Sequence, residues 1–312
     1  MSKVLVVSEY YNEVDNIPGL VGNLAEQTQK PNFVLLIDDG SNDDSTEVFQ
    51  KHLKQVGLES TLYTMPPKIK PDANLKGRAY TKVDILNSDW LDNHDYDYLM
   101  KVDADSRMPK TYIELCTKIL DRFPIFGTMA GRIHGEPGSP TPMGTGKFVR
   151  WSVLKKTRGR YWDIDPDSLW NLFAIAMGYR MIIPKDLLLT VTRPTHMYGP
   201  KGYYNFGRRM YYVGWSLPNA LIYTFTLLTK LDQPQYFLRG YLHAFTERQW
   251  RYRDSEVEDY FSLSRMLRRK LRISHQSDFA TILDLGMSPQ FEEELTQDFL
   301  ETVYARVQAA LE

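Results

Sequence analysis

The sequence lacks the cysteine framework of a secreted protein. Its 312 residues include one cysteine, Cys116, so no disulfide can form within the chain. A lone thiol is typical of proteins from a reducing compartment. The chain enters an apolar run almost at once, at residues 3–7, so we expect no signal peptide. These features predict a cytoplasmic protein, with the inner face of the membrane as a second location.

A charge excess of either sign is also missing. Lysine and arginine number 38 and aspartate and glutamate 39, for a formal net charge of -1, which argues against nucleic acid as a partner. No G-x-G-x-x-G follows the first apolar run, and Gly146-Lys147 lacks the earlier glycine of a P-loop. No histidines and cysteines cluster at zinc spacing. Dinucleotide, P-loop and structural zinc sites are therefore not expected.

Apolar runs and helical periodicity alternate along the first half of the chain. The runs at residues 3–7, 33–37 and 98–102 predict buried strands. A weaker strand is expected over residues 60–65, and residues 77–86 are expected to form a helix. Strand–helix alternation predicts an α/β fold with a mostly parallel central sheet flanked by helices.

Polar side chains follow three of these strands, at the point where each strand ends. They are Asn12 and Glu13, Asp38 and Asp39, and Asp103 and Asp105. Ligands bind outside the carboxyl ends of the strands in such sheets. Residues 103 and 105 point the same way in an extended chain. Mg²⁺ is typically held by one or two carboxylates together with substrate phosphates, so this rim predicts a metal–diphosphate site. A solvated Asp-rich turn is the alternative for a single Asp-x-Asp.

One basic cluster complements the acidic ones. Lys76-Gly77-Arg78 enters the helix expected over residues 77–86. Basic groups and helix N–H donors at such a place suit phosphate. Together, the four clusters predict a nucleoside-diphosphate site with a divalent metal.

These motifs resemble those of the family two glycosyltransferases. The residues that carry the resemblance are Tyr11-Asn12-Glu13, the run Ile37-Asp38-Asp39-Gly40-Ser41-Asn42-Asp43 with Thr46, and Asp103-Ala104-Asp105. The resemblance covers roughly the first two thirds of the chain. It implies a GT-A fold and an inverting transfer of a sugar from a UDP- or GDP-sugar, with Mg²⁺ or Mn²⁺. The acceptor would be a glycan or lipid-linked hydroxyl, or a lipid phosphate.

The resemblance also implies roles for individual residues. The nucleotide sugar would be bound by Tyr11, Glu13, Asp38, Asp39, Lys76, Arg78 and Asp103. The metal would be held by Asp105, Asp103 and His196, although His196 is equally well explained as an exposed loop residue.

The general base is expected just before a helix over residues 168–177. In the family a Glu-Asp pair opens this helix, and its aspartate is the base. Here the glutamate is missing, because Pro166-Asp167 stands in its place. Asp167 is the first candidate and Asp165 the second. A helix N-cap is the alternative role for Asp167.

We expect two domains. A GT-A domain would span residues 1–200, with a nucleotide-sugar half (1–108) and an acceptor half (109–200), and a mainly helical extension would span 201–312.

Two segments of the extension raise the question of membrane contact. Residues 210–229 carry no charged side chain, but Pro218 and Asn219 in the middle argue against a span. A packed helix pair and a helix at a membrane surface both stay open. Residues 265–272 are basic with apolar residues between, which predicts a solvated helix face or contact with anionic lipid or a phosphorylated acceptor.

Two other functions are weighed against glycosyl transfer. Sugar nucleotidyltransferases also pair carboxylates on an α/β sheet, but they carry a glycine-rich loop after the first strand, and residues 8–13 contain no glycine. A sugar-nucleotide-binding protein without catalysis would explain the missing glutamate before Asp167.

Overall fold

The structure is a computed structural model that describes residues 1–64, 81–83, 94–136, 138–159, 161–162, 166–193, 199–228, 233–249, 251–271, 280–287 and 295–312. Four residues with expected site roles, Lys76, Arg78, Asp165 and His196, lie outside the described residues.

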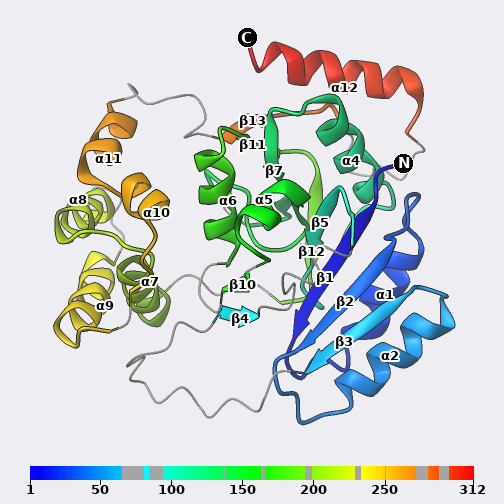
Figure 1. Cartoon of the computed structure of the whole chain (residues 1–312), viewed down its shortest axis with the longest axis horizontal. Coiled ribbons are helices and arrows are strands. Elements are labelled where there is room, and N and C mark those ends of the chain that lie inside the picture. The colour runs from blue at the N-terminus through cyan, green and yellow to red at the C-terminus, as the bar shows by residue number, and fades with distance from the viewer. Residues whose placement is uncertain are drawn as a thin grey trace.

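An eight-stranded sheet forms the centre of the molecule (Figure 1). Its strand order is β13-β11-β7-β9-β5-β1-β2-β3, and β9 alone among these strands runs antiparallel to its neighbours. The strands are β1 (Val4–Tyr10), β2 (Phe33–Asp38), β3 (Ser60–Thr64), β5 (Tyr98–Lys101), β7 (Phe126–Met129), β9 (Lys147–Arg150), β11 (Arg180–Pro184) and β13 (Ala280–Leu283). The predicted mostly parallel sheet is confirmed.

Helices bury both faces of this sheet. Alternate residues of β1 point to opposite sides, so Val4 and Val6 belong to one core and Leu5 and Val7 to the other. The first core is closed by α1 (Ile17–Ala25), α2 (Ser45–Gln55), α4 (Tyr112–Arg122) and α12 (Gln297–Ala309). The second is closed by α5 (Trp151–Lys156), α6 (Pro166–Ala176) and the helices between residues 199 and 271. Burial on both faces explains the continuous apolar runs of β1 and β2.

The helices after residue 199 form a layer against α6. They are α7 (Pro200–Tyr212), α8 (Leu217–Leu228), α9 (Pro234–Thr246), α10 (Ser255–Tyr260) and α11 (Leu263–Lys270). Helices α7 and α9 approach closely at two glycines. A Cβ on Gly207 would lie 2.0 Å from the Phe237 carbonyl oxygen, and one on Gly240 would lie 1.9 Å from that of Tyr204. In the part of the chain that the structure describes, no helix is both long and apolar enough to span a bilayer.

Two small sheets stand beside the main one. Strand β12 (Leu188–Val191) lies between β6 (Ser106–Arg107) and β8 (Arg132–Ile133). Strand β4 (Thr81–Val83) pairs with β10 (Tyr161–Trp162). The helix expected over residues 77–86 is therefore wrong at residues 81–83, where pairing with a distant strand overrides the local helical pattern.

Candidate active site

A cavity of about 340 Å³ opens at the carboxyl ends of β1 and β5. Its wall is made by Glu9, Tyr10, Tyr11, Glu13, Asp39, Asp103, Ala104, Asp105 and Arg193. The strand order places β5, β1 and β2 side by side, so the polar segments that follow them meet at one edge. The structure thus brings together five residues with expected roles, namely Tyr11, Glu13, Asp39, Asp103 and Asp105.

Asp38 and Asp39 face different surroundings, as neighbours at a strand end should. Asp39 lines the cavity, whereas the carboxylate of Asp38 accepts hydrogen bonds from the Thr46 hydroxyl (2.6 Å) and the Ser41 amide (2.7 Å). Burial would raise the pKa of Asp38, but these hydrogen bonds outweigh it and lower the pKa. Asp38 therefore fixes the turn between β2 and α2 and is not among the residues that line the cavity.

Further hydrogen bonds join the segment after β1 to the turn after β2. The amide of Glu13 donates to the Ser45 hydroxyl (2.7 Å), and the amide of Asn42 donates to the Asn12 side chain (2.9 Å). Asn12 has a left-handed backbone, with φ of 53°, a conformation that asparagine tolerates better than most residues. These contacts hold Tyr11 and Glu13 at the cavity wall.

Asp103 is bound to a lysine from its own strand. The Lys101 Nζ atom lies 2.6 Å from Asp103 Oδ1, and Lys101 is 9% exposed. Burial lowers the pKa of Lys101, but the charge and hydrogen bond of Asp103, together with the charges of Asp167 and Asp105, outweigh burial and raise it. The backbone amide of Asp103 donates to the Thr145 hydroxyl (3.0 Å), which in turn donates to Ser106 (2.7 Å).

Asp105 meets Arg193, which follows β12 on the neighbouring small sheet. Arg193 Nε lies 3.4 Å from Asp105 Oδ2, and the same guanidinium contacts the Glu13 carboxylate. Burial and the charge of Asp103 raise the pKa of Asp105, while Arg193 acts against them. The hydrogen bond with Glu13 raises the pKa of Arg193. Arg193 was not predicted from the sequence, because no local motif marks it and the antiparallel pairing of β12 with β6 brings it here.

Asp167 lies in the first turn of α6, one residue after the helix begins at Pro166. Its Oδ2 accepts a hydrogen bond from the Gly144 amide (3.1 Å), and its carbonyl oxygen accepts one from Lys147 Nζ. The charge of Asp167 acts on Lys101, the lysine bonded to Asp103. Asp167 is therefore within electrostatic reach of the acidic rim, although it does not line the cavity.

The metal-ligand set that the described residues offer is small. Across those residues, no three histidine, cysteine, aspartate or glutamate side chains come together as a group that could hold a metal ion. The wall of the cavity carries the carboxylates of Glu9, Glu13, Asp39, Asp103 and Asp105.

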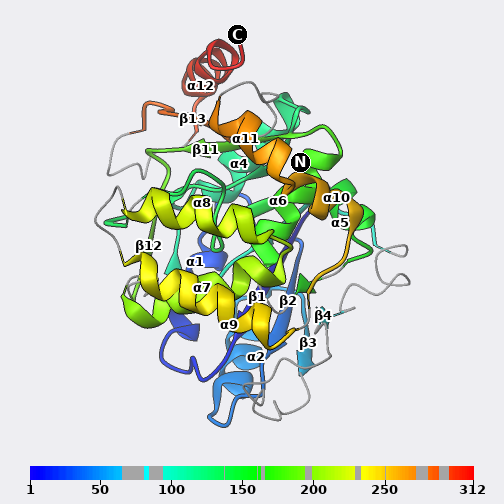
Figure 2. The same cartoon turned by 90° about the vertical axis from the view of Figure 1, so that its left-hand side faces the viewer.

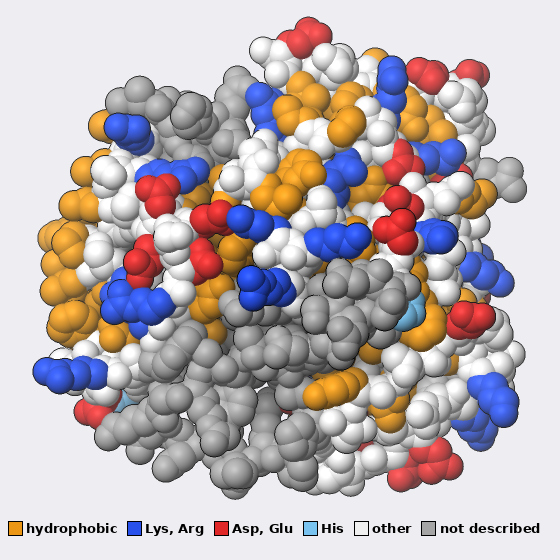
Figure 3. All heavy atoms as spheres, viewed as in Figure 1, with side chains coloured by type: hydrophobic (Ala, Val, Ile, Leu, Met, Phe, Trp, Pro, Cys, Tyr) orange, Lys and Arg blue, Asp and Glu red, His pale blue; other side chains and the backbone are white. Residues whose placement is uncertain are grey.

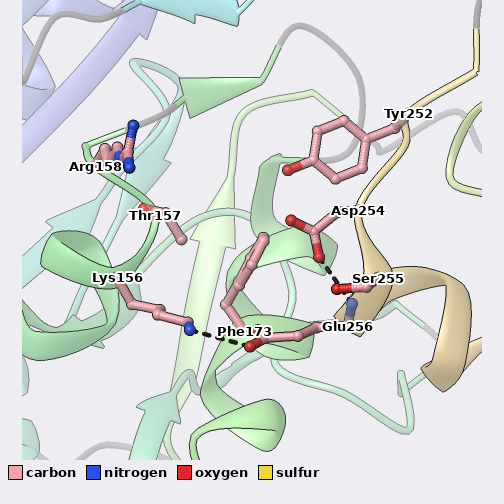
Figure 4. A pocket seen from close by; sticks show the side chains of 8 residues that line it. All are labelled: Lys156, Thr157, Arg158, Phe173, Tyr252, Asp254, Ser255 and Glu256. Atoms are coloured by element: carbon pink, nitrogen blue, oxygen red, sulfur yellow. Dashed lines mark hydrogen bonds and ion pairs between the residues drawn. The ribbon is translucent and has the colours of Figure 1, made fainter.

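A second cavity, of about 420 Å³, lies where α5, α6 and α10 meet (Figure 4). Lys156 and Glu256 form an ion pair across it at 3.0 Å, and Phe173 and Tyr252 supply its aromatic surface. None of the residues that line it has an expected site role.

Comparison with known proteins decides the family. The profile described as Glycosyl transferase family 2 matches residues 6–181, more than half of the chain. This stretch includes all of the expected site residues except His196. The chain belongs to this family. As a family 2 glycosyltransferase, it is an enzyme of glycosyl transfer. A comparison with curated protein sequences found no match.

The chain is also similar to solved structures. One is the mannosyltransferase PcManGT from Pyrobaculum calidifontis in complex with GDP-Man and Mn²⁺, at 17% identity and a TM-score of 0.50, covering 99% of this chain and 75% of that one. Another is S. aureus TarS 1-349 in complex with UDP-GlcNAc, at 17% identity and a TM-score of 0.48, covering 78% and 73%. The fold of this family 2 member is the GT-A type.

Proposed function

We propose that this family 2 member is an inverting, metal-dependent glycosyltransferase that uses a nucleoside-diphosphate sugar. The observation that carries the proposal is the meeting of carboxylates from three segments on one cavity beside Arg193. Asp39, Asp103, Asp105 and Glu13 all contribute to its wall, together with Arg193. Crowded carboxylates of this kind are stable when cations neutralise them.

The donor set fits a hard divalent cation. Mg²⁺ is usually held by one or two carboxylates, with substrate phosphates completing the shell. Asp103 and Asp105 supply two, and the raised pKa of Asp105 reflects the charge of Asp103 as well as burial. Mn²⁺ is the metal named with the PcManGT complex, and Mg²⁺ or Mn²⁺ is proposed here, with His196 as a further ligand. When bound, the cation would neutralise charge on the departing diphosphate.

The nucleotide sugar would lie along the same edge. We assign Tyr11, Glu13 and Asp39 to its recognition, with Asp38 orienting the turn between β2 and α2. Lys76 and Arg78 would add positive charge toward the diphosphate. The donors named with the similar structures are GDP-Man and UDP-GlcNAc, so we propose a GDP- or UDP-sugar.

Asp167 is proposed as the general base, with Asp165 as the second candidate. Its carboxylate would take the proton from the acceptor hydroxyl. The acceptor oxygen forms a bond to the anomeric carbon as the bond from that carbon to the diphosphate oxygen breaks, on opposite faces of the sugar. The nucleoside diphosphate leaves with the electron pair. The protein lowers the barrier by positioning the two substrates and by placing charge at the leaving group.

The acceptor is proposed to be a glycan or lipid-linked group, reached from a membrane surface. Exposed large apolar side chains gather on the outer side of three helices. They are Leu221, Phe225 and Leu228 on α8, Leu242 and Phe245 on α9, and Leu263, Leu267 and Leu271 on or next to α11. We call this set the apolar helix face. Figure 2 shows the three helices side by side on one flank, and Figure 3 shows apolar side chains along that flank.

Basic residues adjoin the apolar helix face. Helix α11 carries Arg265 and Arg268, and the sequence of α11 contains no acidic residue. An amphipathic helix with basic and apolar sides suits an anionic membrane interface. We therefore propose peripheral contact through residues 210–229 and 265–272. The division at residue 200 into a GT-A domain and a helical extension also stays a proposal, and β13 of that extension pairs with β11 in the central sheet.

The test is release of nucleotide from UDP-GlcNAc and GDP-Man in the presence of Mn²⁺, with water as acceptor. Asp167→Asn should lower turnover roughly 100-fold or more, as expected for loss of a general base. Asp284→Asn is the matched control, because Asp284 is exposed and paired with Lys185 away from the cavity. If Asp167→Asn and Asp105→Asn both turn over like the parent, the site assignment is wrong. If the parent binds donor but never releases nucleotide, the protein is a binder without catalysis.

A further inference from the structure

Two buried lysines face each other on neighbouring strands. Strands β5 and β9 pair antiparallel with Lys101 opposite Lys147, and their exposed fractions are 9% and 0%. Like charges directly opposite in a sheet are destabilising, and buried lysine is costly unless it is well paired. Lys101 is accounted for by its ion pair with Asp103. Lys147 needs a separate explanation.

Lys147 is bonded to carbonyl oxygens and not to a carboxylate. Its Nζ atom donates to the carbonyl oxygens of Pro142 (3.2 Å) and Asp167. Burial lowers the pKa of Lys147 to about 7, with Asp167 acting to raise it and Lys101 to lower it further. The Lys147 amine, whose pKa lies near neutral pH, therefore connects two backbone segments through their carbonyl groups. It forms no ion pair with a carboxylate of the described residues.

The two connected segments carry the proposed chemistry. One is the turn Pro142–Gly146. Its Gly144 amide donates to the Asp167 carboxylate, and its Thr145 hydroxyl accepts from the Asp103 amide. The other is the first turn of α6, which carries Asp167. The turn therefore contacts both the proposed base and the proposed metal carboxylate, and Lys147 lies beneath it.

A second buried residue supports the same turn. Asn171, 3% exposed, donates from its side-chain amide to the Pro142 carbonyl (3.0 Å) and accepts from the Thr128 hydroxyl (2.9 Å). Buried polar networks whose members are all bonded specify one arrangement of the backbone. An apolar side chain would fill this space without the cost of desolvation, but it would leave the Pro142 and Asp167 carbonyls less firmly held.

We propose that Lys147 is a positioning residue, which, with Asn171, clamps the turn 142–146 to the start of α6 so that the Gly144 amide orients the Asp167 carboxylate toward the acceptor. The inference rests on the proposed function through the assignment of Asp167 as base. Lys147 touches no substrate and acts through Asp167.

The test is a double-mutant cycle on nucleotide release from UDP-GlcNAc and GDP-Man with Mn²⁺. Lys147→Met should lower kcat roughly 10- to 100-fold, as a misplaced catalytic group does, with the donor KM within about two-fold of the parent. The variant Lys147→Met/Asp167→Asn should be no slower than Asp167→Asn alone, because residues that act as one unit are not additive. Lys147→Gln, which keeps N–H donors, should retain more activity than Lys147→Met.

A second variant covers the case in which Lys147→Met does not fold. Asn171→Asp keeps the acceptor for Thr128 and removes the donor to Pro142, so it should show the same lowered kcat and the same lack of additivity. Thr117→Val is the matched control, since Thr117 is buried and hydrogen-bonded in α4, and it should behave like the parent. The inference would be overturned if the loss of kcat in Lys147→Met or Asn171→Asp multiplied with the loss in Asp167→Asn. It would also be overturned if these variants changed the donor KM and left kcat unchanged. Either result would leave Asp167 in place as the base. If Asp167→Asn alone is fully active, the result contradicts the proposed function itself, because Asp167 is then not the general base.

Discussion

Arg193 and Asp105 form an ion pair, with Nε 3.4 Å from Oδ2, on the wall of the candidate donor cavity. The same guanidinium contacts Glu13. One cation from the segment after β12 thus neutralises carboxylates from two other segments, and 58% of its side chain is exposed. Because the proposed metal would bind the same Asp105 carboxylate, Arg193 and the metal compete for it.

This competition gives a prediction for Arg193→Met. The metal-free variant should melt at a lower temperature than the parent, because Glu13 and Asp105 lose their cation. Mn²⁺ should then bind roughly five-fold more tightly than it binds the parent, because the variant has lost a competing ion pair worth about 1 kcal/mol. Thermal shift measured against Mn²⁺ concentration reports both effects.

Arg253→Met is the matched control, because Arg253 pairs with Glu258 at 2.9 Å on the surface away from the cavity. It should leave the Mn²⁺ dependence of the melting temperature as it is in the parent. Equal Mn²⁺ affinity for Arg193→Met and the parent would show that Arg193 and the metal do not share a site.

Lys147 gives a prediction for the pH dependence of stability. Its folded pKa of about 7 lies below the ordinary value of 10.5, with Asp167 and Lys101 as the charged groups that act on it. Above pH 7 the unfolded chain therefore holds a proton that the folded protein has lost. The free energy of unfolding should rise with pH relative to Lys147→Met, by on the order of 2 kcal/mol between pH 7 and 8.5.

The measurement is urea unfolding of both proteins at several pH values, because the difference between them cancels the titration of all shared groups. A parent-minus-variant difference that stays flat from pH 7 to 8.5 would mean that Lys147 remains charged in the fold.

The sequence predicted the parts of this site that depend on local patterns. Strands β1, β2 and β5 are continuous apolar runs, and the polar residues after them meet because parallel neighbours end at one edge. Arg193 and Lys147 have no such signal, because the β12–β6 pairing brings Arg193 to the cavity and Lys147 bonds to the start of α6, 20 residues along the chain. Strand β4 was missed for the same reason, since its partner β10 lies far along the chain.

The apolar helix face gives a prediction for membrane binding. The parent should co-sediment with vesicles that contain anionic lipid, and less so at high salt, because screening weakens the contribution of α11. The variant Phe225→Ser/Leu228→Ser/Leu267→Ser should stay in the supernatant.

Ile125→Ser/Met177→Ser/Ile282→Ser is the matched control, as it removes three exposed apolar side chains outside that face. It should sediment like the parent. A parent that stays wholly in the supernatant, or a control that loses binding equally, would rule out this face as the contact.

Calorimetric binding of UDP-GlcNAc and GDP-Man, with Mn²⁺ or with EDTA, tests the donor site most directly in the parent and in Asp105→Asn. The account predicts that at least one of the two binds the parent with Mn²⁺. It also predicts at least about ten-fold weaker binding in EDTA, or in the variant, because one lost charge-assisted contact is worth about 1.5–3 kcal/mol. Equal affinity under all these conditions would contradict the claim that the acidic rim holds the diphosphate through a cation.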